Sequence, residues 1–196
     1  MLYVQAPALV FTLKTAHWQR APFDFTHNAR MPHRWKPNVT VAAVIERDGR
    51  FLLVEEDTSD GVRLNNPAGH LDPGESPIQA CAREVLEETA FDFKPTALLG
   101  IYMNRFVRTK TGTDTTYMRF SFTGTLGAFH EGQPLDDGIR RTVWMTQDEI
   151  QAAHDAGQLR SPLVLQSLND YLAGQRFPLG LIYTDASVLV EPETGA

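Results

Sequence analysis

Cysteine and long apolar runs are both scarce in this sequence. Cys81 is the only cysteine among 196 residues, so no internal disulfide can form, which fits a reducing compartment. No apolar run approaches the ~18 to 20 residues that a membrane-spanning helix needs. We therefore expect a cytoplasmic protein that does not enter a membrane. The remaining composition, 42% hydrophobic and 21% charged, is that of a globular protein whose length suits a single domain.

Positive charge is also scarce beyond the N-terminal region. The formal net charge is −6, yet residues 1–37 alone carry +4, because five cations accompany one acid there: Lys14, Arg20, Arg30, Arg34, Lys36 and Asp24. The rest of the chain therefore carries −10. Such an acidic body repels a polyanionic backbone, so nucleic acid is not an expected partner. A small anionic substrate would need cations to hold it.

The first 37 residues show no helical or strand period, and prolines interrupt them at Pro7, Pro22, Pro32 and Pro37. We interpret residues 1–37 as a leader outside the fold, with Met31 as the natural first residue, so that residues 1–30 are dispensable. A basic, acid-poor organellar presequence is the alternative. The domain is then expected over residues 38–182, followed by a C-terminal tail over residues 183–196.

The pattern of strands and helices indicates an α+β fold. β-branched runs flank Asp48-Gly49, a strong hairpin signal, and predict strands over residues 39–46 and 51–56. The later sequence predicts three more strands and two more helices, over residues 96–106, 115–126, 140–145, 146–156 and 161–174. Strands and helices do not alternate regularly, which argues against a doubly wound parallel sheet.

Another helix is predicted to begin sharply after a loop rich in proline and glycine. Ser76 suits the N-cap, Pro77 suits the first helical position, and Gln79 completes a capping box. The buried face of this helix would carry Ile78, Cys81 and Val85. The predicted start of the helix therefore depends only on three neighbouring residues.

Three carboxylates of this helix share one face, because Glu84, Glu87 and Glu88 follow each other at helical spacing. Like charges so spaced cost ~0.2–0.5 kcal/mol per exposed pair. A hard cation such as Mg²⁺ would offset this repulsion, since it takes carboxylate oxygens and still holds water and phosphate. The alternative is a solvated acidic face that is relieved by Arg83, which can reach Glu87 one turn further on.

The spacing of these residues resembles a known motif. The segment from Gly69 to Phe91 reads G-x5-E-x7-R-E-V-L-E-E-T-A-F, which resembles the Nudix box, G-x5-E-x7-R-E-U-x-E-E-x-G-U, where U is a bulky apolar residue. Ala90 departs from the motif, because it stands where the box has a glycine that ends the helix, and alanine there costs roughly 1 kcal/mol or changes the ending. Beyond the box, NPAGHLDPGE and LRSPLV are similar to the phosphatase NudJ branch of the Nudix superfamily, with likeness from Lys36 to Ile182.

The resemblance implies a fold and a set of site residues. The fold is an α/β/α sandwich around a mixed β-sheet. The implied metal ligands are Glu84, Glu87, Glu88 and the carbonyl oxygen of Gly69. Glu84 is also the candidate general base, although a carboxylate bound to metal is a weaker base. Arg83 and Glu75 would orient the other side chains of the site.

Outside the box the candidates are less specific. A further acid from a distant loop is implied, and Asp136 or Asp137 is placed to supply it, with a solvated turn as the alternative. Three cations would suit phosphate oxygens, with plain surface residues as the alternative: Arg105, Lys110 and Arg119. Aromatic residues suited either to stacking on a ring or to the core are Phe106, Tyr117 and Phe120. His70 lacks the neighbouring ligands of a zinc site, and Cys81 is expected to be inert packing.

The sequence thus predicts a Mg²⁺-dependent hydrolase, with Mn²⁺ as an alternative ion, acting as a monomer or homodimer. The implied substrates are nucleoside tri- and diphosphates and other small diphosphates, such as hydroxymethylpyrimidine diphosphate of the thiamine pathway, losing phosphate one unit at a time. No motif for reading a base edge is visible, so we expect broad tolerance toward the leaving group. Two alternatives are a nucleotide-sensing module without turnover and an isomerase of prenyl diphosphates, for which Cys81 is poorly placed.

Overall fold

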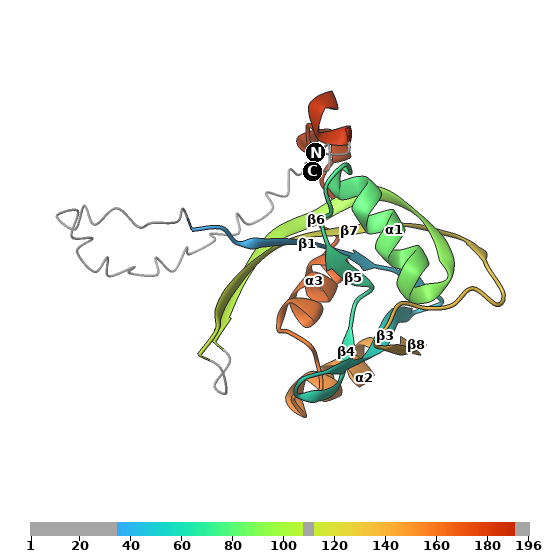
Figure 1. Ribbon diagram of the computed structural model, residues 1–196. Helices are drawn as coiled ribbons and strands as arrows, with labels where there is room; N and C mark the ends of the chain where they lie inside the picture. Colours follow the sequence, from blue (N-terminus) through green and yellow to red (C-terminus); the bar gives the residue numbers. More distant parts are fainter. Residues whose placement is uncertain (1–34, 108–111, 191–196) are drawn as a thin grey trace, which may run out of the picture. The chain divides into compact units, whose positions relative to one another are not determined.

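The computed structural model describes residues 35–107 and 112–190 (Figure 1). The predicted residue Lys110 and most of the predicted leader lie outside these ranges. The strands are β1 (Asn38–Val44), β2 (Glu46–Arg47), β3 (Arg50–Thr58), β4 (Gly61–Asn65), β5 (Ala68–His70), β6 (Phe91–Val107), β7 (Asp114–Phe129) and β8 (Ile139–Met145). The helices are α1 (Pro77–Thr89), α2 (Gln147–Asp155) and α3 (Leu163–Leu172), followed by the short 3-10 helices η1 (Leu179–Leu181) and η2 (Ala186–Leu189).

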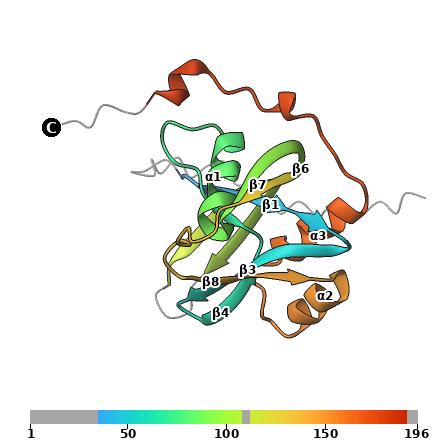
Figure 2. The same cartoon turned by 90° about the vertical axis from the view of Figure 1, so that its right-hand side faces the viewer.

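The strands form two sheets, which Figure 2 shows from the side of β3 and β8. The first sheet has the order β5-β1-β7-β6 and is mixed, because β1 runs parallel to β7 while the other pairs are antiparallel. In the second sheet, β3 pairs with β2 and then β4 along one edge and with β8 along the opposite edge, and all these pairs are antiparallel. The chain passes from one sheet to the other at the buried Ile45.

The predicted hairpin forms, but it belongs to the second sheet alone. Asp48 and Gly49 both have positive φ angles, of 54° and 75°, as a two-residue turn of the mirror-image type requires. The turn joins β2 to β3, and Arg47 pairs with Arg50 across it. The strands predicted from the later sequence are also confirmed, and β6 and β7 extend beyond their predicted ends as one long antiparallel pair.

Two apolar clusters lie on opposite sides of the strands and give the sandwich its layers. Alternate residues of β1 divide between them: Val41 and Ala43 join α1 in one cluster, and Val44 joins α2 and α3 in the other. This division follows from the two-residue period of a strand that is covered on both faces. Each fully buried aliphatic side chain contributes about 1.5–3 kcal/mol. The predicted α+β sandwich is thus confirmed, with α1 and α3 on opposite sides of the strands (Figure 1).

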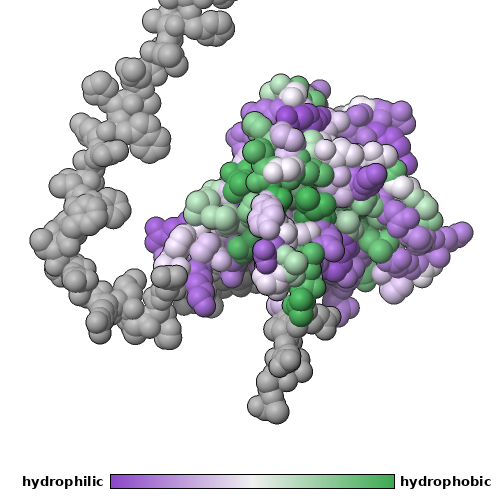
Figure 3. Space-filling model, turned by 90° about the horizontal axis from the view of Figure 1, so that it is seen from above, coloured by the Kyte–Doolittle hydropathy of each residue, from purple (hydrophilic) through white to green (hydrophobic). Residues whose placement is uncertain are grey.

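The C-terminal segment leaves apolar side chains exposed. Leu181, Val188 and Val190 retain about half or more of their accessible surface, and Figure 3 shows apolar residues gathered on the face viewed from above. The domain boundary predicted at Ile182 falls between η1 and η2 and stays a prediction. Within the described parts of the chain, every helix is too short or too polar to cross a bilayer.

Candidate active site

The start of α1 is fixed by the predicted capping box. Ser76 Oγ accepts a hydrogen bond of 3.2 Å from the Gln79 N–H, and Gln79 Oε1 accepts one of 2.9 Å from the Ser76 N–H. Pro77 occupies the first turn, where its missing N–H costs nothing. This local geometry sets the rotation of the helix, and so decides which of its side chains face the loop that precedes it.

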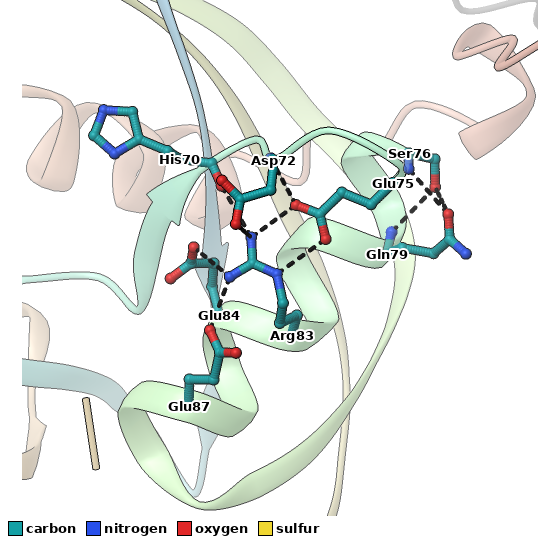
Figure 4. Close-up of polar contacts among 8 residues, drawn as sticks. All are labelled: His70, Asp72, Glu75, Ser76, Gln79, Arg83, Glu84 and Glu87. Atoms are coloured by element: carbon teal, nitrogen blue, oxygen red, sulfur yellow. Dashed lines mark hydrogen bonds and ion pairs between the residues drawn. The ribbon is translucent and has the colours of Figure 1, made fainter. Parts of the chain in front are cut away.

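Arg83 is the centre of a charged network between that loop and α1 (Figure 4). Its Nη1 donates hydrogen bonds of 2.8 Å to both Glu84 and Glu87, and its Nη2 donates one of 3.0 Å to the His70 carbonyl oxygen. Two further bonds reach Glu75 from the other edge of the guanidinium. Hydrogen bonding to Glu75, Glu87 and Glu84 raises the pKa of Arg83 further above its usual range, against an opposing effect of burial.

The loop carboxylate Glu75 is held in its ionised form by this network. Burial pushes the pKa of Glu75 upward, but hydrogen bonds from Arg83 and from the Asp72 N–H outweigh burial and lower it. The predicted orienting pair therefore exists as a contact. This contact ties the loop to the second turn of α1.

Three carboxylates converge beside Arg83. The oxygens of Glu84, Glu87 and Asp136 lie within 4.8 Å of one another, and this trio combines two residues of α1 with one of the loop before β8. The Asp136 N–H donates a 3.0 Å hydrogen bond to the Glu87 carbonyl oxygen, which fixes the loop against the helix. Burial raises the pKa of Glu84, an effect that Arg83 opposes and that Glu87 and Asp136 add to.

Gly69 is the close neighbour of this trio on β5. A Cβ atom at this position would stand 2.1 Å from the carboxylate of Glu84, so no residue larger than glycine fits while Glu84 keeps its place. The motif therefore needs glycine at position 69, because the Glu84 carboxylate occupies the space that a side chain would take. Its backbone borders the acidic trio, as a residue offering a carbonyl ligand would.

Glu88 takes a different position from the other two helix acids. It is buried, and its Oε2 accepts a 2.8 Å hydrogen bond from the Ala68 N–H. Burial raises the pKa of Glu88 to about 8, the Ala68 N–H lowers it, and Glu84, Glu56 and Asp136 raise it further. The converging trio therefore contains Asp136 and not Glu88. The assignment of Glu88 as a metal ligand stays a prediction.

A cavity of about 450 Å³ opens beside the trio, bordered by Ala68, Gly69 and His70 of β5. Arg119 lines it and is only 8% exposed; burial lowers the pKa of Arg119 to about 10, while Glu56 and Glu88 act to raise it. Tyr117, two residues before Arg119 on β7, lines the same cavity and lies against His70 with ring centroids 6.2 Å apart.

The other sequence candidates divide between this cavity and the rest of the molecule. Phe106 lines the cavity. Arg105 does not, because it points away and forms an exposed ion pair of 2.7 Å with Asp114. Phe120 packs against the apolar cluster under α1. Cys81 is fully buried with its thiol near the Ala42 carbonyl oxygen, and burial raises its pKa, so it suits the predicted role of inert packing.

Sequence reasoning missed the polar residues that line the cavity from other strands. These are Thr40 of β1, Glu56 of β3 and Asn65 of β4. A signal exists for one of them, since Asn65 is a buried amide directly ahead of the proline- and glycine-rich loop. Thr40 and Glu56 look like ordinary polar strand residues until the strands are assembled.

Comparison with known proteins agrees with this geometry. A profile of the NUDIX domain matches residues 34–166. The chain belongs to the Nudix family, and it is a hydrolase that acts on phosphoric anhydride bonds. The phosphatases NudJ of Escherichia coli strain K12 and of Shigella flexneri are each 38% identical to it over 148 residues, which cover 76% of this chain and 92% of each relative.

Solved structures show the same family. A NUDIX hydrolase from Nitrosomonas europaea is 50% identical, with a TM-score of 0.69 over 76% of this chain and 98% of that one. A MutT NUDIX hydrolase from Burkholderia pseudomallei is 19% identical, with a TM-score of 0.56 over 69% of this chain and 98% of that one, and it shares the fold. The match to the NUDIX domain over residues 34–166 includes the trio and the residues that line the cavity.

Proposed function

We propose that this protein is a Mg²⁺-dependent phosphatase that removes the terminal phosphate from nucleoside tri- and diphosphates and from other small diphosphates, such as hydroxymethylpyrimidine diphosphate. The observation that carries the proposal is the convergence of Glu84, Glu87 and Asp136 beside a cavity large enough for a small ligand. The relatives named phosphatase NudJ support the release of phosphate as the product.

The residues present fit a hard divalent cation. Three carboxylates within 4.8 Å of each other offer the oxygen ligands that Mg²⁺ and Mn²⁺ prefer, and the missing side chain at Gly69 leaves room around Glu84. Glu84, Glu87 and Asp136 would hold the ion, with Glu88 and the Gly69 carbonyl as further ligands. Bound Mg²⁺ would neutralise the phosphate oxygens and acidify a bound water molecule.

The chain's own residues have distinct roles in this proposal. Glu84, whose pKa is raised by burial, takes the proton of the attacking water. Arg83 keeps Glu84 and Glu87 in one orientation, and Glu75 keeps Arg83 in place. Arg105 is not among the residues that line the cavity and pairs with Asp114, so its contact with substrate stays a prediction. Attack at the terminal phosphorus then leaves the heterocyclic end of the substrate on the cavity side of the trio.

The bond that breaks can be identified with ¹⁸O-labelled water. A nucleoside triphosphate should give diphosphate first and monophosphate later, with the label in free phosphate and none in the nucleotide. Pyrophosphate as first product, or label in the nucleotide, would exclude terminal attack and leave the family assignment intact. Binding without any turnover would favour the nucleotide-sensing alternative.

A matched pair of variants links that reaction to the trio. Glu84→Gln should slow both phosphate-releasing steps by about 10²-fold or more, because the proposed base and a ligand are both lost. Asp155→Asn removes an acid at the end of α2, where Asp155 accepts a hydrogen bond from Gln151, and should leave the rate unchanged. Equal rates for the two variants would exclude Glu84 as a catalytic residue.

A further inference from the structure

The cavity beside the acidic trio has apolar walls and a polar floor. Its walls include Phe106, Tyr117, Pro162 and Leu163. Its floor is built by four strands from both sheets, which contribute Thr40, Glu56, Asn65 and Arg119. Apolar walls around a few placed polar groups are the usual architecture of a site for a small organic ligand.

The floor holds buried polar atoms of both kinds without hydrogen-bond partners. Nε and Nη1 of Arg119 have no such partner among the described residues, although the residue is more than nine-tenths buried. Within the same part of the chain, the oxygens Glu56 Oε1 and Asn65 Oδ1 also lack a hydrogen bond, and Glu56 Oε1 has only a 3.4 Å ion pair with Arg160. A buried polar group left in this state costs about 1–3 kcal/mol.

The mixture of donors and acceptors selects the ligand. An ionised phosphate offers acceptors alone, so it would pair with Arg119 and leave the oxygens of Glu56 and Asn65 facing further oxygens. An aromatic ring that carries an amino group beside a ring nitrogen or carbonyl offers both a donor and an acceptor on one edge. The faces of such a ring suit the walls formed by Phe106 and Tyr117.

We propose that this cavity binds the heterocyclic leaving group of the substrate by its amino-bearing edge. Arg119 donates to the ring acceptor, and Glu56 and Asn65 accept from the amino group. This inference rests on the proposed function, because it assigns the substrate's ring to the cavity next to the trio. It replaces the expectation of broad tolerance, since a ring without an amino group places a carbonyl oxygen against Glu56.

Cytidine and uridine triphosphates provide the direct comparison. They share ribose and phosphates, and they differ in whether the ring edge presents an amino group beside a ring nitrogen or a carbonyl beside an N–H. We expect kcat/KM for phosphate release to be at least about tenfold higher for the cytidine compound, because a site with buried polar groups rejects a ligand that leaves them unpaired. Equal values for the two would overturn the proposal.

Two variants test the individual contacts. Glu56→Gln replaces an acceptor by a side chain that can also donate, so the preference for the cytidine compound should fall to less than about threefold. Arg119→Met should raise KM for both compounds about tenfold and change kcat less than about twofold, since it removes a donor to the ring. Arg50→Met removes an exposed cation at a distant turn, where Arg50 pairs with Glu149, and should preserve both constants. A large fall in kcat for Arg119→Met would instead assign Arg119 to the phosphates and overturn the proposal.

A binding measurement separates failure of this inference from failure of the proposed function. If neither the two triphosphates nor hydroxymethylpyrimidine diphosphate is hydrolysed, the proposed function fails, and calorimetric titration with the cytidine and uridine monophosphates still tests the cavity by the same preference. The ring could belong to a nucleotide or to a small diphosphate without ribose. Hydroxymethylpyrimidine diphosphate, which has the amino edge without ribose, distinguishes these two. A higher kcat/KM for it than for the cytidine compound would identify the ribose as dispensable, and a lower value would identify a nucleoside as the preferred ligand. Both results support the proposal only when the cytidine compound is also preferred over the uridine compound.

Discussion

Glu75 and Arg83 are joined by two parallel hydrogen bonds, of 2.9 Å from Nε and 2.7 Å from Nη2. This two-pronged contact fixes the plane of the guanidinium, and Nη1 is thereby left to donate to both Glu84 and Glu87. An acid in the loop thus determines the orientation of two acids on the helix through the guanidinium to which all three are hydrogen-bonded. The contacts thus run from Glu75 in the loop to Arg83, and from Arg83 to Glu84 and Glu87 of the trio.

Replacing Arg83 by lysine should therefore impair the reaction while keeping the charge. An ammonium group cannot make the parallel pair with Glu75 and also reach both helix acids, so kcat/KM should fall about 10- to 100-fold. Steady-state kinetics with a nucleoside triphosphate would measure the loss. Arg50→Lys, at an exposed single ion pair, is the matched control and should retain full activity. Equal activity of the two variants would show that charge alone suffices at position 83.

Divalent metal should stabilise the folded protein, because the repulsion within the trio is relieved only when the ion is bound. At about 100 times Kd, Mg²⁺ should add about 2.7 kcal/mol to the free energy of unfolding. Glu87→Gln and Asp136→Asn should each reduce this gain, and Asp155→Asn should not. Thermal melts with Mg²⁺ and with a chelator would measure it, and a parent protein whose melting temperature ignores Mg²⁺ would contradict the proposed metal site.

Without metal, Glu88 should make stability depend on pH. Burial raises the pKa of Glu88 from an ordinary 4.5 to about 8, so in this window the folded protein holds a proton that the unfolded chain has lost. The free energy of unfolding should therefore fall as pH rises through the window, by up to about 1.4 kcal/mol per pH unit. Glu88→Gln lacks this proton and should show a flatter profile in chelator-treated samples. Parallel urea-unfolding profiles for parent and variant would contradict the shift.

The end of α1 carries a cost that a single substitution can remove. Ala90 has a φ of 58°, so the helix keeps the left-handed ending despite the absence of the motif's glycine. Glycine there should remove about 1–2 kcal/mol of strain and lose about 0.8 kcal/mol of buried methyl surface, for a net gain of roughly 0.5 kcal/mol. The control is Ala156→Gly at the end of α2, where φ is −80° and no gain is expected. Chemical denaturation would measure the free energy of unfolding of both variants. Equal changes at positions 90 and 156 would contradict the prediction.

The parts of the fold that were predictable from the sequence depend on neighbouring residues. The capping box of α1, the turn at Asp48-Gly49 and the pairing of Arg83 with Glu87 all join residues no more than four apart. The sequence predicts Asp136 only as one of two candidates for the distant acid, because its position depends on a backbone hydrogen bond to Glu87 from a loop 49 positions later. Contacts of that range are not encoded in any local pattern.

The faces of the long strands were not predictable for a different reason. Arg105 and Arg119 look alike in the sequence, yet one is exposed and paired with Asp114 and the other is buried in the cavity floor. β7 is covered on both sides over much of its length, so its residues do not alternate cleanly between apolar and polar. Only the observed register shows that Arg119 lies beside Thr40 on the adjacent strand.

The passage of the chain between sheets at Ile45 has a consequence for how such enzymes diversify. The acids that perform the proposed chemistry come mainly from one continuous helix, whereas the cavity floor is shared among four strands of two sheets. An exchange at Glu56 or Asn65 would change which ring is admitted and leave α1 untouched. Duplicated copies of such a gene can therefore acquire new substrates by a few strand substitutions, and a protein engineer can alter recognition without rebuilding the catalytic helix.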